Sequence, residues 1–118
     1  SLRRQRQMCI RDRFQNLKVG ILINDRSASA AEVFTAALKE HGRAWVMGEK
    51  SYGKGVVQKL FPLSNGAALQ MTVSHYYTPS GQMIERVGIA PNQVYPMPHE
   101  LKDESYVEHV AEILINRR

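Results

Sequence analysis

The sequence has very little cysteine and no long apolar run. Cys9 is the one cysteine among 118 residues, so no internal disulfide framework and no cysteine-based metal site can form. No stretch approaches the roughly 18 consecutive apolar residues that indicate a membrane-spanning helix. The hydrophobic content of 43% is ordinary for a soluble globular chain. We therefore expect a single soluble domain without disulfides.

Net positive charge is scarce outside the first thirteen residues. Residues 1–13, SLRRQRQMCIRDR, contain five arginines and one aspartate, so this stretch carries almost all of the net charge of +5. The rest is nearly neutral and has no basic surface interleaved with aromatics, so we expect no nucleic-acid partner. Residues 1–13 have no helical or strand periodicity. We expect residues 1–13 to be a disordered or non-native lead, with a genuine basic tail as the alternative, and residues 14–118 to be the folded part.

The histidines do not form the pattern of a metal site either. The histidines show no metal-ligand spacing, so we expect no metal site. They are His41, His75, His99 and His109.

The stretch GEKSYGKG, residues 48–55, lacks the last residue of a phosphate-binding loop. Such a loop needs a hydroxyl after its lysine to ligate Mg2+, and a helix must follow. Position 55 is glycine, and the next residues, VVQKLFPL, are β-branched and alternating, which predicts a strand. We expect no nucleotide to bind, so Lys54 needs another explanation.

The pattern from Phe14 onward predicts an α/β fold. KVGILIND is typical of a strand buried in the middle of a sheet, and AWVMG predicts a second buried strand. SASAAEVFTAALKEHG, between them, predicts an amphipathic helix, so the three segments form a βαβ unit with parallel strands. The expected apolar face of the helix contains Ala30, Val33, Phe34, Ala37 and Leu38, with Glu32, Lys39 and Glu40 largely away from it.

The second half of the chain predicts a β-hairpin and a helix. VVQKLFPL and AALQMTVSHYYT alternate and are joined by the turn SNG. TPSG predicts a turn with Pro79 at its second position, and residues 82–98 are irregular and proline-rich. SYVEHVAEILINRR predicts an amphipathic helix whose terminal cations suit its dipole.

Ser29 and Lys54 lie in loops that follow the two parallel strands of this unit. The carboxyl ends of such strands meet at one edge of a sheet, where α/β proteins usually place catalytic groups. A desolvated lysine has a lowered pKa and can take the proton of a serine as general base. The alternative is structural, because Ser29 and Glu32 also form a capping box and a lysine between glycines is usually an exposed loop residue.

Longer blocks favour the catalytic interpretation. Residues 21–58, ILINDRSASAAEVFTAALKEHGRAWVMGEKSYGKGVVQ, and residues 63–92, LSNGAALQMTVSHYYTPSGQMIERVGIAPN, resemble the catalytic core of the carboxy-terminal processing peptidases, or tail-specific proteases. The resemblance implies that Ser29 is the nucleophile, that Lys54 is the general base and that Gln58 orients the lysine. It also implies an oxyanion amide from Ala30 and a supporting role for Glu32.

The resemblance implies the rest of the functional interpretation. The fold would be a crotonase-like or ClpP-like βαβ core with an added hairpin and a C-terminal helix, incomplete at its N-terminus and lacking the PDZ domain. The activity would be that of a Ser-Lys serine endopeptidase without cofactors, acting on proteins with flexible C-terminal tails. The chain alone would be inactive. The resemblance also implies a bacterial periplasm or cell envelope and leaves open a membrane-associated parent chain. The alternative is a catalytically silent or peptide-binding member of the same fold.

Overall fold

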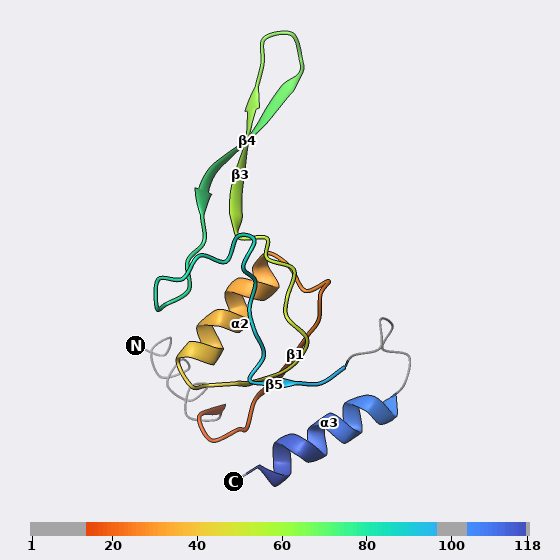
Figure 1. Cartoon of the computed structure of the whole chain (residues 1–118). Coiled ribbons are helices and arrows are strands. Elements are labelled where there is room, and N and C mark those ends of the chain that lie inside the picture. The colour runs from red at the N-terminus through yellow and green to blue at the C-terminus, as the bar shows by residue number, and fades with distance from the viewer. Residues whose placement is uncertain (1–13, 97–103, 118) are drawn as a thin grey trace, which may run out of the picture.

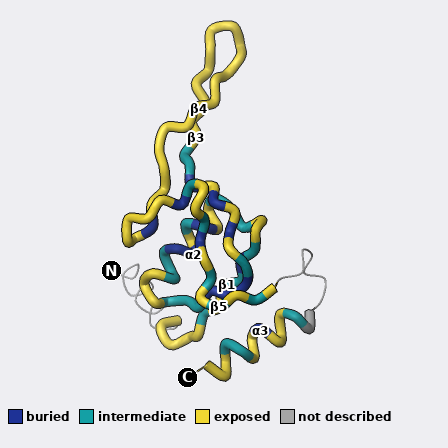
Figure 2. Tube along the Cα trace, in the orientation of Figure 1, coloured by how far each residue is buried: buried dark blue, intermediate teal, exposed yellow. Residues whose placement is uncertain are grey.

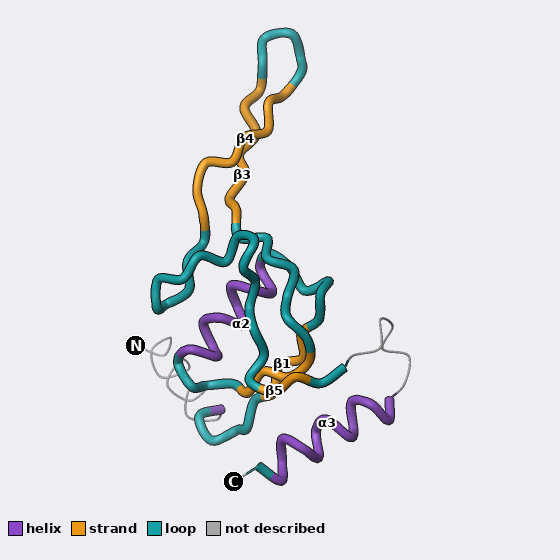
Figure 3. Tube along the Cα trace, viewed as in Figure 1, coloured by secondary structure: helices purple, strands orange, loops and turns teal. Residues whose placement is uncertain are grey.

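A mixed α/β unit and a projecting hairpin make up the computed structural model, which describes residues 14–96 and 104–117 (Figures 1 and 3). The α/β class and the order of the predicted elements are confirmed. The elements are β1 (Gly20–Ile23), α2 (Ala30–Glu40), β2 (Trp45–Gly48), β3 (Val56–Pro62), β4 (Ala68–His75), β5 (Gln93–Val94) and α3 (Glu104–Asn116).

The sheet of the α/β unit has the order β1-β2-β5, and all its pairs are parallel. Gly20 pairs with Trp45 and Ile23 with Gly48, so the predicted parallel βαβ unit is confirmed. The prediction that the first strand is the buried middle of the sheet is wrong for the described chain, because β2 lies between β1 and β5. The strand β5 was missed within residues 82–98, since two residues are too few to show a period.

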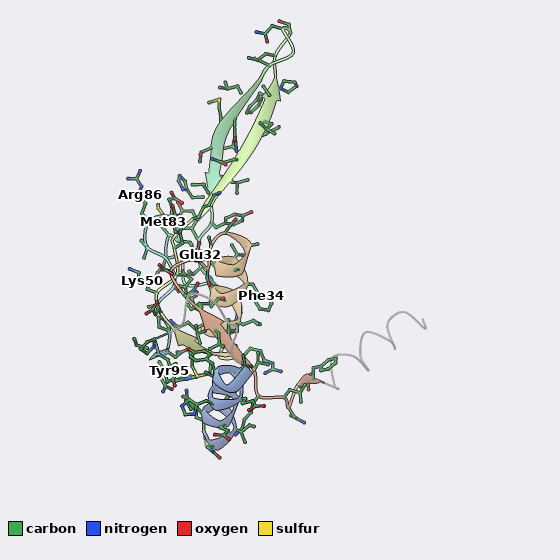
Figure 4. All side chains as sticks on the ribbon, turned by 90° about the vertical axis from the view of Figure 1, so that its right-hand side faces the viewer. Glu32, Phe34, Lys50, Met83, Arg86 and Tyr95 are labelled. Atoms are coloured by element: carbon green, nitrogen blue, oxygen red, sulfur yellow. The ribbon has the colours of Figure 1, made fainter. Side chains whose placement is uncertain are left out.

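The face that α2 turns to the core is shifted from the predicted apolar face, although Val33 of the predicted face packs against the core cluster. Glu32, Thr35 and Ala36 are buried, whereas Phe34 is 60% exposed. Figure 4 shows Glu32 and Phe34 on different sides of the helix. Thr35 and Glu32 tolerate burial because their side-chain oxygens form hydrogen bonds. Thr35 Oγ1 donates to the Ala31 carbonyl at 2.7 Å. Glu32 accepts hydrogen bonds from two loops at the carboxyl ends of β1 and β2. The core cluster consists of Ile23, Ala36, Val46, Ile84 and Ile89.

The hairpin of β3 and β4 extends away from the α/β unit (Figure 1). It is antiparallel, as predicted, and its strands are exposed almost throughout (Figure 2). The predicted turn at residues 78–81 is also present, because the Gly81 amide donates to the Thr78 carbonyl at 2.8 Å. Within this turn, the Ser80 amide donates a hydrogen bond to Glu40, at the end of α2, at 2.7 Å.

The helix α3 lies against the face of the sheet that carries Gly20, Leu22 and Met47, opposite the face that packs against α2. Leu114 approaches Gly20 so closely that a Cβ atom added there would be 2.9 Å away from its side chain. The rings of Tyr95 and Tyr106 are 5.5 Å apart. Arg117 packs over the Trp45 ring. Because Arg117 follows the helix, the last turn of α3 itself holds no basic residue, contrary to the prediction that the helix ends in cations. Among the described helices, none has the length and apolar character needed to cross a membrane.

Candidate active site

Two loops meet at the carboxyl ends of β1 and β2. Residues 24–29 follow β1 and residues 49–55 follow β2. The Tyr52 amide donates to the Ser27 carbonyl at 2.9 Å, so the loops are joined directly. The prediction that both loops emerge at one edge of the sheet is therefore confirmed.

The Glu32 carboxylate is the main connection between the loops. It is 1% exposed, and its Oε2 accepts from the amides of Ser29 at 2.9 Å and Lys54 at 2.8 Å. Its Oε1 accepts from Ser51 Oγ and from the Gly53 amide, both at 2.6 Å. Four donors offset the cost of burying the carboxylate. A single oxygen atom thus holds the backbones of Ser29 and Lys54 together.

Ser29 has a strained backbone immediately before α2. Its φ is 57° and its ψ is −119°, whereas an ordinary N-cap residue lies in the β region. A non-glycine residue in such a conformation costs on the order of 1–3 kcal/mol and persists only where its surroundings hold it. Ala30 is the first residue of α2, where an amide has no acceptor within the helix. The glutamate half of the predicted capping box is present, because Glu32 accepts a hydrogen bond from the Ser29 amide. The backbone conformation of Ser29, however, is not that of a common N-cap residue.

The loop around Lys54 is held by carboxylates at its amides. Gly53 and Lys54 donate to Glu32, and the Gly55 amide donates to Glu85 Oε2 at 2.7 Å. These amides are therefore already engaged rather than turned toward a phosphate. The following residues form β3, as predicted. The Lys54 side chain is exposed, so the described residues do not supply the desolvation expected of a general base.

Gln58 lies within β3, whereas Lys54 precedes this strand. The register of the hairpin shifts between Val57 and Gln58. Gln58 Oε1 accepts a hydrogen bond from Gln70 Nε2 at 2.7 Å. An orienting role for Gln58 stays a prediction.

Ser51 and Glu85 contribute to the site but were not singled out from the sequence. Ser51 is buried, and its Oγ donates to Glu32 and accepts from the Ile89 amide at 2.6 Å. Glu85 lies 30 residues beyond Gly55, and no local pattern indicates their contact. Over residues 14–96 and 104–117, no group of three potential metal ligands is present.

The fold resembles that of a class of processing proteases. The chain matches the solved structure of a photosystem II D1 C-terminal processing protease with a TM-score of 0.69 and 32% identity, over 84% of this chain and 25% of that one. It matches mature CPAF with a TM-score of 0.60 and 27% identity, over 81% of this chain and 19% of that one. The tricorn protease, at 17% identity and a TM-score of 0.61, shares the fold.

The relatives found by sequence similarity are also named as processing proteases or peptidases. A carboxy-terminal-processing protease of Bartonella bacilliformis is 45% identical over 86 residues, which are 73% of this chain and 20% of the relative. Carboxyl-terminal-processing peptidase 2, chloroplastic, of Arabidopsis thaliana is 44% identical over 87 residues, which are 73% of this chain and 16% of the relative. The model of peptidase family S41 matches residues 3–95, and the chain belongs to this family. It spans about a fifth of the length of these relatives.

Proposed function

We propose that this chain carries the reacting groups of a serine endopeptidase that cleaves proteins near their C-terminal tails. The observation that carries the proposal is the shared Glu32 oxygen, which joins the Ser29 turn and the Lys54 loop. Membership of peptidase family S41 and the names of the relatives support a protease as the general class.

The proposed reaction is acyl transfer followed by hydrolysis. Neutral Lys54 takes the proton of Ser29 Oγ as the oxygen attacks the carbonyl carbon of the scissile peptide. The Ala30 amide, free of an intrahelical acceptor, stabilises the oxyanion. Lys54 then protonates the leaving amine, and an acyl-enzyme on Ser29 remains. Water, deprotonated by Lys54, hydrolyses this ester and restores the serine.

Lys54 needs a drier environment than this chain alone provides. Its side chain is exposed here, whereas a lysine that acts as general base needs desolvation. We propose that the remainder of the protein, or the bound substrate, covers Lys54 and lowers its pKa. Gln58 would orient it through its side-chain amide, which keeps free hydrogen-bonding capacity beside the bond that Oε1 accepts from Gln70.

We extend the proposal to the complete protein, using the features that the family resemblance implies. The complete catalytic domain would have a crotonase-like core, with the second oxyanion donor and a tail-binding PDZ domain outside this chain. It would use neither metal nor nucleotide and would act in the periplasm or envelope of a bacterium. The exposed Lys54 favours one alternative, a catalytically silent member that binds peptides without cleaving them.

The test compares Ser29→Ala, Lys54→Arg and the double variant in the full-length protein. Arginine keeps the charge but cannot be deprotonated in a protein, so Lys54→Arg should abolish cleavage of an unfolded, fluorescently labelled casein as completely as Ser29→Ala. The double variant should be no worse than either single one, because the residues act as a unit. All variants should keep the parent circular dichroism spectrum.

Lys50→Arg is the matched control, since Lys50 is an exposed lysine in the same loop. It should retain activity within about twofold of the parent. Cleavage by Lys54→Arg within tenfold of the parent would refute the dyad. Casein binding without cleavage by the parent would establish the silent alternative.

A further inference from the structure

We propose that Glu85 is a positioning residue that sets the direction of the Lys54 side chain. This inference rests on the proposed function, in which Lys54 is the general base. Its basis is the hydrogen bond from the Gly55 amide to Glu85 Oε2, at 2.7 Å, made by a half-buried carboxylate.

The two peptide planes that flank Lys54 are held by different carboxylates. The plane before its Cα contains the Lys54 amide, which donates to Glu32 at 2.8 Å. The plane after its Cα contains the Gly55 amide, which donates to Glu85. The orientations of these planes determine φ and ψ of Lys54, and hence the direction of its Cα–Cβ bond. Glu32 binds only the first of these planes, and Glu85 binds the second.

Residues 84–88 fit closely around the same loop. The Arg86 amide donates to the Gly53 carbonyl at 2.9 Å, and this contact comes with an Arg86 φ of 61°, a left-handed value unusual for a side chain of this size. A Cβ at Gly55 would lie 2.5 Å from the Glu85 amide nitrogen. Figure 4 shows Arg86 and Glu32 near the base of the hairpin. The loop is therefore enclosed by backbone, and Glu85 is bound to it from a fixed segment.

Loss of this bond should affect the chemical step more than substrate binding. A misplacement of about 1 Å can cost on the order of 10²-fold in rate, whereas the exposed surfaces that would contact substrate are unchanged. We expect Glu85→Ala in the full-length protein to lower kcat about 10- to 100-fold, with KM within about threefold of the parent. Casein cleavage is the assay.

Two further variants separate the hydrogen bond from the charge. Glu85→Gln keeps an acceptor at the same reach without charge, so its kcat should be within about threefold of the parent. Glu85→Asp keeps the charge but is one methylene shorter, so it should lose kcat nearly as Glu85→Ala does. This variant also serves if Glu85→Ala fails to fold. Glu108→Ala, at an exposed carboxylate on α3, is the matched control and should behave as the parent.

The outcomes distinguish this inference from the proposed function. If Ser29→Ala abolishes cleavage while folded Glu85→Ala and Glu85→Asp keep kcat within twofold, the dyad stands and the role of Glu85 is refuted. Glu85→Gln as defective as Glu85→Ala would also overturn positioning through this hydrogen bond. If Ser29→Ala cleaves as the parent does, the proposed function itself fails.

Discussion

At the scale of the residue, a buried glutamate connects the two loops of the candidate site. Glu32 accepts four hydrogen bonds, and each donor belongs to one of the two loops or to the start of α2. A carboxylate suits this place because it offers only acceptors. The strained φ of Ser29 is compatible with this arrangement, since the bond to Glu32 holds its amide in place.

Replacing Glu32 by glutamine should therefore be costly despite the equal size of the side chains. One of the two oxygens becomes an NH2 group, which then faces at least one backbone amide that can only donate. We expect Glu32→Gln to lower the free energy of unfolding by about 1–3 kcal/mol, measured by urea denaturation. Glu108→Gln, at an exposed carboxylate, should change it by less than about 0.5 kcal/mol. Equal stabilities of the two variants would contradict the role assigned to Glu32.

At the scale of the element, the loops require glycine for two different reasons. Gly42, at the end of α2, has a φ of 64° and no atom within 4 Å of an added Cβ, so it needs only a left-handed backbone. Gly88 has a similar φ of 68°, but a Cβ there would lie 2.5 Å from the Ser51 carbonyl oxygen. Residues 84–89 can approach the Lys54 loop only because this position lacks a side chain.

These two glycines form a matched pair for mutation. Both alanine variants pay the cost of a left-handed backbone, about 1 kcal/mol. Gly88→Ala adds a steric conflict with backbone, which costs about 1–3 kcal/mol more. We expect the melting temperature of Gly88→Ala to fall clearly below that of Gly42→Ala, with a matching loss of casein cleavage in Gly88→Ala alone. Similar melting temperatures would show that the loop can move away from residues 84–89.

At the scale of the whole molecule, the described part of the chain exposes much apolar surface on α2 and on the hairpin. Phe34 on α2 is 60% exposed, and both strands of the hairpin carry exposed apolar side chains. Figure 2 shows that the residues of the hairpin are exposed almost throughout. The chain also spans only about a fifth of the length of its relatives. The apolar side chains exposed on the hairpin include Leu60, Phe61, Leu69, Met71 and Val73.

We therefore expect residues 14–118 alone to be a poor protease. Lys54 is exposed in this chain, and the proposed second oxyanion donor lies outside it; the loss of one such donor typically costs about 10²-fold or more in rate. Casein cleavage by residues 14–118 should be less than about 1% of that of the full-length protein at equal molarity. Ser29→Ala in residues 14–118 is the control for contaminating protease. Serine-dependent cleavage near the full-length rate would mean that this chain holds a complete site.

Local patterns predicted much of the fold and located the candidate loops. The parallel strands with the helix between them and the hairpin follow from periodicity and turn residues, which act over a few neighbouring positions. The blocks around Ser29 and Lys54 identified the family. The structural prediction for residues 1–13 lies outside the described residues and stays a prediction, although the family match begins at residue 3.

Other features were decided only by contacts between distant segments. The buried face of α2 carries Glu32 because loop amides from residues 53 and 54 satisfy its carboxylate, and hydropathy alone assigns a carboxylate to solvent. The pairing of β5 with β2 and the bond from Gly55 to Glu85 join residues 30 or more positions apart. The amino-acid sequence by itself determined all the described elements except β5, and it predicted Ser29 and Lys54 as the reacting residues. Tertiary structure decided which polar groups become buried, because burial depends on partners that only the folded chain brings together.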